Sequence, residues 1–221
     1  MVCPQYNSQF GYNMAAPTTT SPYGVSVDFT VPSGVASVAG TSTGKWANAG
    51  NLLAYDSSGN YVECSITYFA SGGAQSQGWY FWWGYNGSGQ YVSLSADPTS
   101  DSVTLTLLYN GTNWIAFLND NTNSLNNHSK SFSTSIAGYV IASSTIMWEN
   151  GGNGTCSNYS SWGSSMTFSN LTYYDSNDNT ISFTNSINSL VNCNVPNTCS
   201  GGTACITENN SPTNLTISRN C

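Results

Sequence analysis

The sequence predicts an all-β fold, an antiparallel sandwich or barrel. Ten short runs along the 221 residues alternate apolar and polar side chains with the period of two that marks a half-buried strand. Turn-forming segments rich in Gly, Asn and Asp, such as DSSGN and ADPTSD, separate these runs. No window combines a helical period with capping residues. Short strands at this spacing are typical of antiparallel sandwiches and barrels.

Three regions follow one another along the chain. Residues 1–22 are predicted to form an irregular arm with little periodicity. Residues 190–221 form a tail rich in Cys, Asn and Gly that disulfides would have to hold. The β-domain lies between them, over residues 23–189. Its strands are expected at 25–31, 46–55, 61–69, 78–85, 90–96, 102–109 and 113–119, and near 138–148, 164–174 and 179–184.

The segment QGWYFWWGY places six aromatic rings in nine residues. A strand over 78–85 turns four of them to one face: Trp79, Phe81, Trp83 and Tyr85. Tyr80 and Trp82 then lie on the other face. One set fills the core, and the second either floors an outer groove or is covered by a loop, the arm or another subunit. Aromatic floors stack sugar rings or hold extended peptides.

Charge and hydropathy narrow the classes of partner. Charged residues make up only 6% of the chain, and the net charge is -7, so nucleic acids and anionic membranes are poor partners. A surface kept soluble by amides and hydroxyls changes its charge little on acidification, which fits an extracellular or cell-surface location in an acidic or hot environment. The sequence contains no apolar run long enough to span a membrane. It also lacks a signal-peptide core, so we expect a mature product of a longer precursor.

Seven cysteines in so polar a chain indicate disulfides and an oxidising compartment. We expect Cys64 to pair with Cys156 inside the β-domain. Two further bridges are expected in the tail, with three connectivities open, among Cys193, Cys199, Cys205 and Cys221. Cys3 is then left as a free or intersubunit thiol. No C-x-x-C pair is present, which argues against zinc ribbons and thioredoxin chemistry.

Eight Asn-x-Ser/Thr triplets are candidate N-glycosylation sites. A chain rich in Asn, Ser and Thr also makes such triplets by chance. Because the cysteines independently indicate export, we expect several to carry covalent N-glycans. The acceptor residues are Asn86, Asn110, Asn127, Asn153, Asn158, Asn170, Asn209 and Asn214.

Four segments together resemble the glutamic peptidases, or eqolisins. GWYFWWGYNGSGQYVSLSADPTSDSVTLTLLYNGTNWIAFLNDNT resembles the central half of that family. VDFTVPSG resembles its TVPS segment, STIMWENGG its AEW-I-x-E strand, and SSWGSSMTFSNLTYYD its ADFG-x-VTFTNA segment. The resemblance covers about residues 23–185. It implies a concanavalin-like jelly roll, a β-sandwich of two curved sheets with seven strands in each.

The same resemblance argues against the family's reaction. It implies a Glu that acts as general base on a water and a Gln that stabilises the oxyanion. The Glu position, directly before Trp148, is Met147 here, and a thioether cannot accept a proton. The Gln position is Ala54 or Glu63, depending on which segment is matched. The sequence therefore predicts an eqolisin-like fold with its catalytic dyad lost, and more probably no enzyme than an enzyme.

Other chemistry has weaker support. Glu63 and Glu149 could share a proton as an acid-base pair, although residue 149 lies about 6–7 Å from the family's position. His128, the only histidine, is expected in a solvated loop rather than in a Ser-His-Asp triad. The segments NDNTN and DSNDN resemble calcium loops only in composition, so turns are expected there. We predict no metal and no cofactor.

These observations predict an exported, glycosylated structural protein of a cell surface or an extracellular filament. Copies of the chain are expected to polymerise head to tail, with the arm adding to a sheet edge or groove of the next subunit. The arm's apolar residues have the period of a strand: Tyr6, Phe10, Tyr12 and Met14. Alternatively, the arm folds back over Tyr80 and Trp82. Two other functions stay open: an acid endopeptidase with a rearranged dyad, and a glycan-binding module that uses Tyr80 and Trp82.

Overall fold

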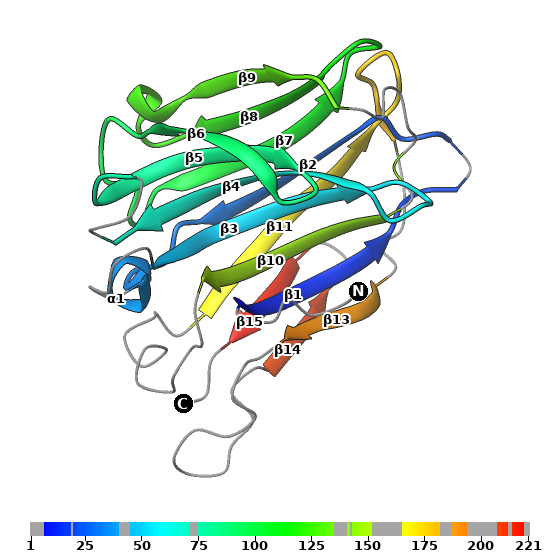
Figure 1. The fold of residues 1–221 in the computed structure, drawn as a ribbon. Coiled ribbons are helices and arrows are strands. Elements are labelled where there is room, and N and C mark those ends of the chain that lie inside the picture. The colour runs from blue at the N-terminus through cyan, green and yellow to red at the C-terminus, as the bar shows by residue number, and fades with distance from the viewer. Residues whose placement is uncertain are drawn as a thin grey trace.

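A computed structural model confirms an all-β sandwich of two antiparallel sheets (Figure 1). It describes residues 7–18, 20–39, 45–70, 75–134, 141, 143–151, 165–181, 187–193, 207–211 and 214–218. For 143–151, 187–193, 207–211 and 214–218 it describes the course of the backbone alone. In the described part of the chain, the helical elements are short: α1 (Val35–Ala39) and the 3-10 turn η1 (Ser124–Asn126).

One sheet has seven strands. In spatial order they are β13 (Ile187–Cys193), β1 (Asn7–Ala15), β10 (Ser143–Gly151), β3 (Trp46–Tyr55), β4 (Tyr61–Phe69), β5 (Gly78–Tyr85) and β6 (Ser88–Ser93). The predicted strands at 46–55, 61–69 and 78–85 are confirmed to the residue. Tight turns join β3 to β4 and β5 to β6, so these four strands follow one another in the sheet as they do along the chain.

The second sheet has eight strands. Seven follow in spatial order: β14 (Thr207–Ser211), β15 (Asn214–Ser218), β11 (Ser165–Tyr174), β2 (Gly24–Thr30), β7 (Ser102–Tyr109), β8 (Trp114–Asp120) and β9 (His128–Phe132). The short β12 (Thr180–Ile181) pairs with β11. Strand β9 was not expected from the sequence, because HSKSF has only one large apolar residue.

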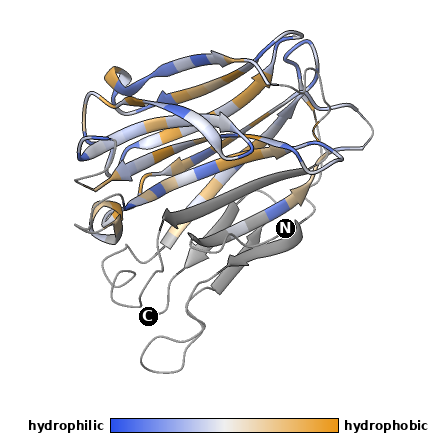
Figure 2. Cartoon of the chain, viewed as in Figure 1, coloured by the Kyte–Doolittle hydropathy of each residue, from blue (hydrophilic) through white to orange (hydrophobic). Residues whose placement is uncertain are grey.

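The core lies between the two sheets. Hydrophobic and hydrophilic residues are interspersed along the strands (Figure 2), as expected for strands with one face toward the core. One contact fixes the spacing of the sheets: the ring of Phe29 on β2 lies against Gly50 on β3. A Cβ atom added at Gly50 would lie 2.6 Å from Cζ of that ring. A glycine is therefore required where the two sheets approach most closely at this point.

The predicted arm is a strand of the sandwich. Strand β1 lies inside the seven-stranded sheet, with β10 on one side and β13 on the other. Met14 is fully buried in the core. In this structure of a single chain, the evenly spaced segment is an inner strand of the sheet, and its exchange between copies stays a prediction. For residues 7–15, the alternative that the arm covers Tyr80 and Trp82 is wrong, because β10, β3 and β4 separate β1 from β5. Tyr6 lies outside the described residues, and the side chains of Phe10 and Tyr12 are not described.

The C-terminal tail also joins both sheets. Strand β13 pairs with β1 in one sheet, and β15 pairs with β11 in the other. Backbone hydrogen bonds therefore attach this part of the chain to both sheets, and the disulfides expected in the tail stay a prediction. The pairing partners lie far away in the sequence, which is why local patterns did not reveal them.

The predicted bridge between Cys64 and Cys156 does not form in this structure. Cys64 is a free, fully buried thiol that points between the sheets, and its Sγ lies 3.9 Å from the carbonyl oxygen of Thr106. Burial, and secondarily the negative charge of Glu63, raise the pKa of this thiol well above its usual value. The side chain of Cys193 is not described, and the remaining cysteines lie outside the described residues: Cys3, Cys156, Cys199, Cys205 and Cys221.

Two carboxyl groups meet where β7 begins and β8 ends. Asp120 is buried, and its Oδ1 accepts hydrogen bonds from the backbone N–H groups of Thr122 and Asn123. Asn126 donates to its other oxygen at 2.9 Å. Burial, a hydrogen bond to Asp120 and the charge of Asp120 raise the pKa of Asp101.

Replacement of Asp101 by Asn should stabilise the protein more at pH 7 than at pH 3. A raised pKa means that Asp101 contributes stability below its unfolded pKa, and that this contribution is lost as the pH rises through the folded pKa. Calorimetry of Asp101→Asn at both pH values measures the change in Tm, and Asp178→Asn in an exposed turn is the control. Equal changes at both pH values would contradict this reading of the pair.

Gly50→Ala should lower the free energy of unfolding by about 1–3 kcal/mol, because the added methyl group collides with the Phe29 ring. Denaturant unfolding of the single variants and of the double variant with Phe29→Leu measures the coupling. A smaller side chain at position 29 should recover part of the loss. If the two changes are strictly additive, the proposed contact does not determine the spacing.

Candidate functional site

The aromatic strand β5 has the two faces that its sequence predicts. Trp79, Phe81 and Trp83 belong to the core between the sheets. Tyr80 and Trp82 belong to the opposite, outer face of the seven-stranded sheet and to no core cluster. This outer face is the candidate functional site, since it combines aromatic rings with a group of polar side chains.

A row of buried polar side chains crosses the outer face of β3 and β4. Its members are Asn48, Asn51, Glu63, Ser65 and Thr67, each between 2 and 6% exposed. Thr67 donates to Oδ1 of Asn48 at 2.6 Å, and its hydroxyl oxygen lies 2.8 Å from that of Ser65. Buried polar groups are retained in a fold when they satisfy one another in this way. We call these five residues the polar row.

Glu63 and Asn51 form the part of the polar row that is able to do acid-base chemistry. Nδ2 of Asn51 donates to Oε2 of Glu63 at 3.5 Å, a long hydrogen bond between neighbouring strands. A carboxylate accepts protons and an amide donates hydrogen bonds to an oxyanion. The pair thus contains both group types of a glutamic peptidase dyad. Its carboxylate, however, is only 6% exposed, so water has little access to it.

The two residues that the sequence matched to the family's Gln lie on opposite faces of the seven-stranded sheet. Ala54 is fully buried in the core between the sheets, so it does not belong to the outer face. Glu63 does belong to it. On the neighbouring strand, the register pairs Met147 with Asn51. The side chains of β10 are not described, but this position of the sheet carries a methionine in the sequence.

The register also places Glu149 far from Glu63. Thr145 on β10 pairs with Leu53 on β3, and Leu53 pairs with Glu63 on β4, so Thr145 lies level with Glu63. Glu149 lies four residues further along β10, which is two strands away from β4. With a rise near 3.4 Å per residue and strands near 4.8 Å apart, their Cα atoms are separated by about 16 Å. Two glutamate side chains do not span that separation of their Cα atoms, so their carboxyl groups do not share a proton. The predicted pair of Glu63 and Glu149 is therefore wrong.

A cluster of rings lies on the outer face beside the polar row. Ring centroids are 5.3 Å apart for Phe69 and Tyr80, 5.6 Å for Tyr80 and Tyr91, and 6.1 Å for Phe69 and Tyr91. Trp82 pairs with Tyr91 across β5 and β6. We call Phe69, Tyr80, Trp82 and Tyr91 the aromatic edge. Phe69 and Tyr91 were missed from the sequence, although the turn in YNGSGQ sets the pairing that brings Tyr91 beside Trp82.

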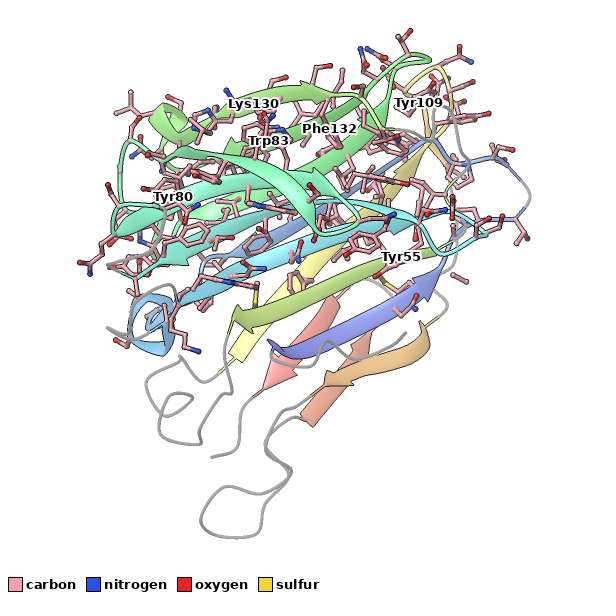
Figure 3. All side chains as sticks on the ribbon, in the orientation of Figure 1. Tyr55, Tyr80, Trp83, Tyr109, Lys130 and Phe132 are labelled. Carbon is pink, nitrogen blue, oxygen red and sulfur yellow. The ribbon has the colours of Figure 1, made fainter. Side chains whose placement is uncertain are left out.

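A second, smaller aromatic group lies at the other end of this face. Tyr55 and Tyr61 contact each other with centroids 5.2 Å apart and their ring planes tilted by 45°, and both pack against Leu53. Figure 3 shows Tyr55 and Tyr80 toward opposite ends of the seven-stranded sheet. The outer face therefore has rings at both ends and the polar row between them.

His128 is part of a strand rather than of a solvated loop. Its ring stacks on Phe81 at 6.0 Å, with 4° between the planes. Burial and the charge of Lys130 lower the pKa of His128, although a backbone hydrogen bond to Ser93 partly opposes them. Among the described residues its Nε2 has no hydrogen-bond partner. Among the described residues His128 is not part of a Ser-His-Asp triad. Its neighbour on β9, Lys130, has its Nζ 5.6 Å from the centroid of the Trp83 ring (Figure 3).

The two calcium-like segments are turns. Asp175 accepts hydrogen bonds from the side-chain amide of Asn179 and from the backbone of Asn179 and Asn177, which lower its pKa. In the other segment Asp120 accepts hydrogen bonds from the backbone of Thr122 and Asn123. Within the described ranges no group of three His, Cys, Asp or Glu side chains could hold a metal ion. No helix described there is long and apolar enough to cross a membrane.

Four of the eight glycosylation triplets have described acceptor side chains: Asn86, Asn110 and Asn127 lie on turns or strand ends, and Asn170 lies at the register shift within β11. Asn110 and Asn127 accept hydrogen bonds through Oδ1 from the backbone of Thr112 and Asp120 respectively. Asn86 accepts from the backbone of Tyr61 and donates through Nδ2 to Asn60. Asn170 donates through Nδ2 to Asp28. Occupancy is a prediction at every site. Asn153 and Asn158 lie outside the described residues, and only the backbone is described at Asn209 and Asn214.

The sequence matches no protein-family model. No curated protein matches it either.

Solved structures do resemble the fold. Scytalido-glutamic peptidase with a transition state analog inhibitor has a TM-score of 0.62 at 15% identity, covering 96% of this chain and 98% of that chain. The same peptidase with a peptide-based transition state analog has a TM-score of 0.60 at 14% identity, covering 97% of this chain and 98% of that chain. SCP-B, a member of the eqolisin family in complex with a tripeptide, has a TM-score of 0.58 at 15% identity, covering 97% of this chain and 98% of that chain. At these identities the likeness shows the fold, and the chain has an eqolisin-like β-sandwich.

Proposed function

We propose that this chain is an exported, glycosylated structural protein of a cell surface or an extracellular filament, built on a peptidase-like sandwich that does not hydrolyse peptides. One observation carries the proposal: the register pairs Met147, not a carboxylate, with the amide residue Asn51 on the outer face. Composition supports export, since the chain has few charges and many glycosylation triplets.

The chemistry of the outer face supports the absence of hydrolysis. Peptide hydrolysis by a glutamic dyad needs a general base that holds a water and an amide that stabilises the oxyanion. Scytalido-glutamic peptidase, whose fold is similar, binds transition state analogs in its solved structures. In this chain a thioether residue occupies the β10 position, and the carboxylate of Glu63 is buried against Asn51.

Strand β1 supports a route to assembly. It begins the described part of the chain, yet it lies between two strands that come more than a hundred residues later. A strand in such a position can be supplied by another copy of the chain, with the same hydrogen bonds, if the connection to β2 opens. Repeated exchange of this kind gives an open-ended fibre, which Cys3 would lock if it pairs between subunits.

A second candidate, an acid endopeptidase with a rearranged dyad, is favoured by one observation. Asn51 and Glu63 bring an amide and a carboxylate within 3.5 Å on the outer face. In that case Glu63 is the general base and Asn51 stabilises the oxyanion.

A proteolysis assay separates the two candidates. We expect the purified chain not to cleave an unfolded protein substrate between about pH 2 and 5, where carboxylate pairs are active. Gel electrophoresis and mass spectrometry of the substrate check this. Acid cleavage that is abolished by Glu63→Gln but kept in the matched variant Glu149→Gln would establish the peptidase instead.

Deletion of residues 1–15 tests the assembly route. Because β1 separates β10 from β13 and buries Met14, the truncated chain should lose its cooperative unfolding transition. A synthetic peptide of residues 1–22, added in trans, should restore the transition, and the same peptide with Met14→Asp should not. Near-UV circular dichroism measures both.

Failure of the peptide to restore the truncated chain would rule out strand exchange. Electron microscopy of the native protein should show fibres, and particles alone at high concentration would refute the filament.

A further inference from the structure

The aromatic edge has a flat floor made by two facing glycines. Gly84 on β5 pairs with Gly89 on β6. A Cβ atom added at Gly84 would lie 2.8 Å from Cη2 of Trp82, and one added at Gly89 would lie 2.6 Å from Cε2 of the same ring. The indole therefore occupies the space that side chains at these two positions would need. It is held against the backbone of the sheet rather than projecting freely.

The neighbouring rings are also fixed in place. The hydroxyl group of Tyr80 donates to the carbonyl oxygen of Ser76 at 2.9 Å, and Tyr80 itself is only 7% exposed. Tyr91 packs against Tyr80 and Phe69 but is 42% exposed. Among the described residues the other large apolar side chain with such exposure is Leu125, which lies on η1. The aromatic edge thus presents ordered rings to solvent, and ordered rings bind at a low entropic cost.

The chemistry around the rings selects a neutral ligand. Residues 69–93 contain no Asp, Glu, Lys, Arg or His, and the exposed hydroxyl of Ser93 belongs to the same face, because Ser93 pairs with Tyr80 across β5 and β6. Nucleic acids and anionic lipids are bound through cations, which this segment lacks. A pyranose ring has an apolar C–H face that packs on an aromatic ring and hydroxyl groups that bond to polar side chains.

We propose that Trp82 and Tyr91, supported by Phe69 and Tyr80, form a binding subsite for a pyranose ring of a neutral polysaccharide. The saccharide lies on the outer face of β5 and β6 and packs on the exposed rings, while the hydroxyl groups of Tyr91 and Ser93 hydrogen-bond its hydroxyl groups. This site is independent of whether the chain forms filaments, because the aromatic edge is distant from β1 in the sheet.

The test titrates the full chain with neutral hexasaccharides of glucose, mannose, galactose and N-acetylglucosamine, followed by NMR and calorimetry. We expect at least one to bind with a Kd in the millimolar range or tighter. Tyr91→Ala should weaken this binding at least about fivefold and is expected to fold, because Tyr91 is the most exposed ring of the edge. Tyr55→Ala, at the other end of the same face, is the matched control and should bind as the wild type does.

A second variant tests the position of the indole rather than its presence. Gly89→Ala keeps every ring but forces Trp82 to move, so it should also weaken binding. Near-UV circular dichroism confirms that each variant is folded. The proposal is overturned if no hexasaccharide binds, or if Tyr91→Ala and the wild type bind equally. It is also overturned if an extended peptide binds along the edge strand β6 while the saccharides do not. Monomeric protein suffices for these measurements, so they do not depend on the filament.

Discussion

The seven-stranded sheet buries side chains on both of its faces, and the rest of the structure depends on this. Along β4, Cys64 and Ile66 enter the core between the sheets, while Glu63, Ser65 and Thr67 are equally buried on the outer face. A sheet in this position needs apolar residues on one face and mutually bonded polar residues on the other, because an unpaired buried polar group costs about 1–3 kcal/mol. The polar row meets this requirement through bonds such as that between Thr67 and Asn48.

This constraint explains why the polar row is an internal part of the fold. Networks of buried polar groups are stable only when their members are satisfied. Glu63 has a partner in Asn51, which the register in turn pairs with Met147 on β10. The negative charge of Glu63 then acts inward, where it helps to raise the pKa of the Cys64 thiol. The carboxylate is used by the fold, and little of it is exposed to a substrate.

Local patterns predicted the strands that pair with their neighbours in the chain. The three strands from Trp46 to Tyr85 were correct to the residue, because tight turns join the first two and alternation marks each of them. Strands β13, β14 and β15 were missed, and the segment of β1 was expected to add to another subunit, since the partners of these strands lie far away in the sequence. The two faces of β5 were predicted as well. The alternation of side chains did not predict Tyr91 as a member of the aromatic edge. Its position beside Tyr80 and Phe69 follows from the register of β5 with β6 and from the packing of the rings.

The polar row and the aromatic edge differ in how much of their side chains solvent can reach. The polar row is at most 6% exposed, so whatever binds to this face does not reach Glu63 without a rearrangement. Tyr91 is 42% exposed and lies on β6, and β5 separates it from the polar row on β3 and β4. The groups able to activate a water are therefore enclosed, while the groups able to pack on a ring face solvent. A peptidase requires the reverse, because its carboxylate must meet both water and substrate. A protein that binds without cleaving needs only what this face exposes, and that is the physical reason to seek its ligand at the aromatic edge.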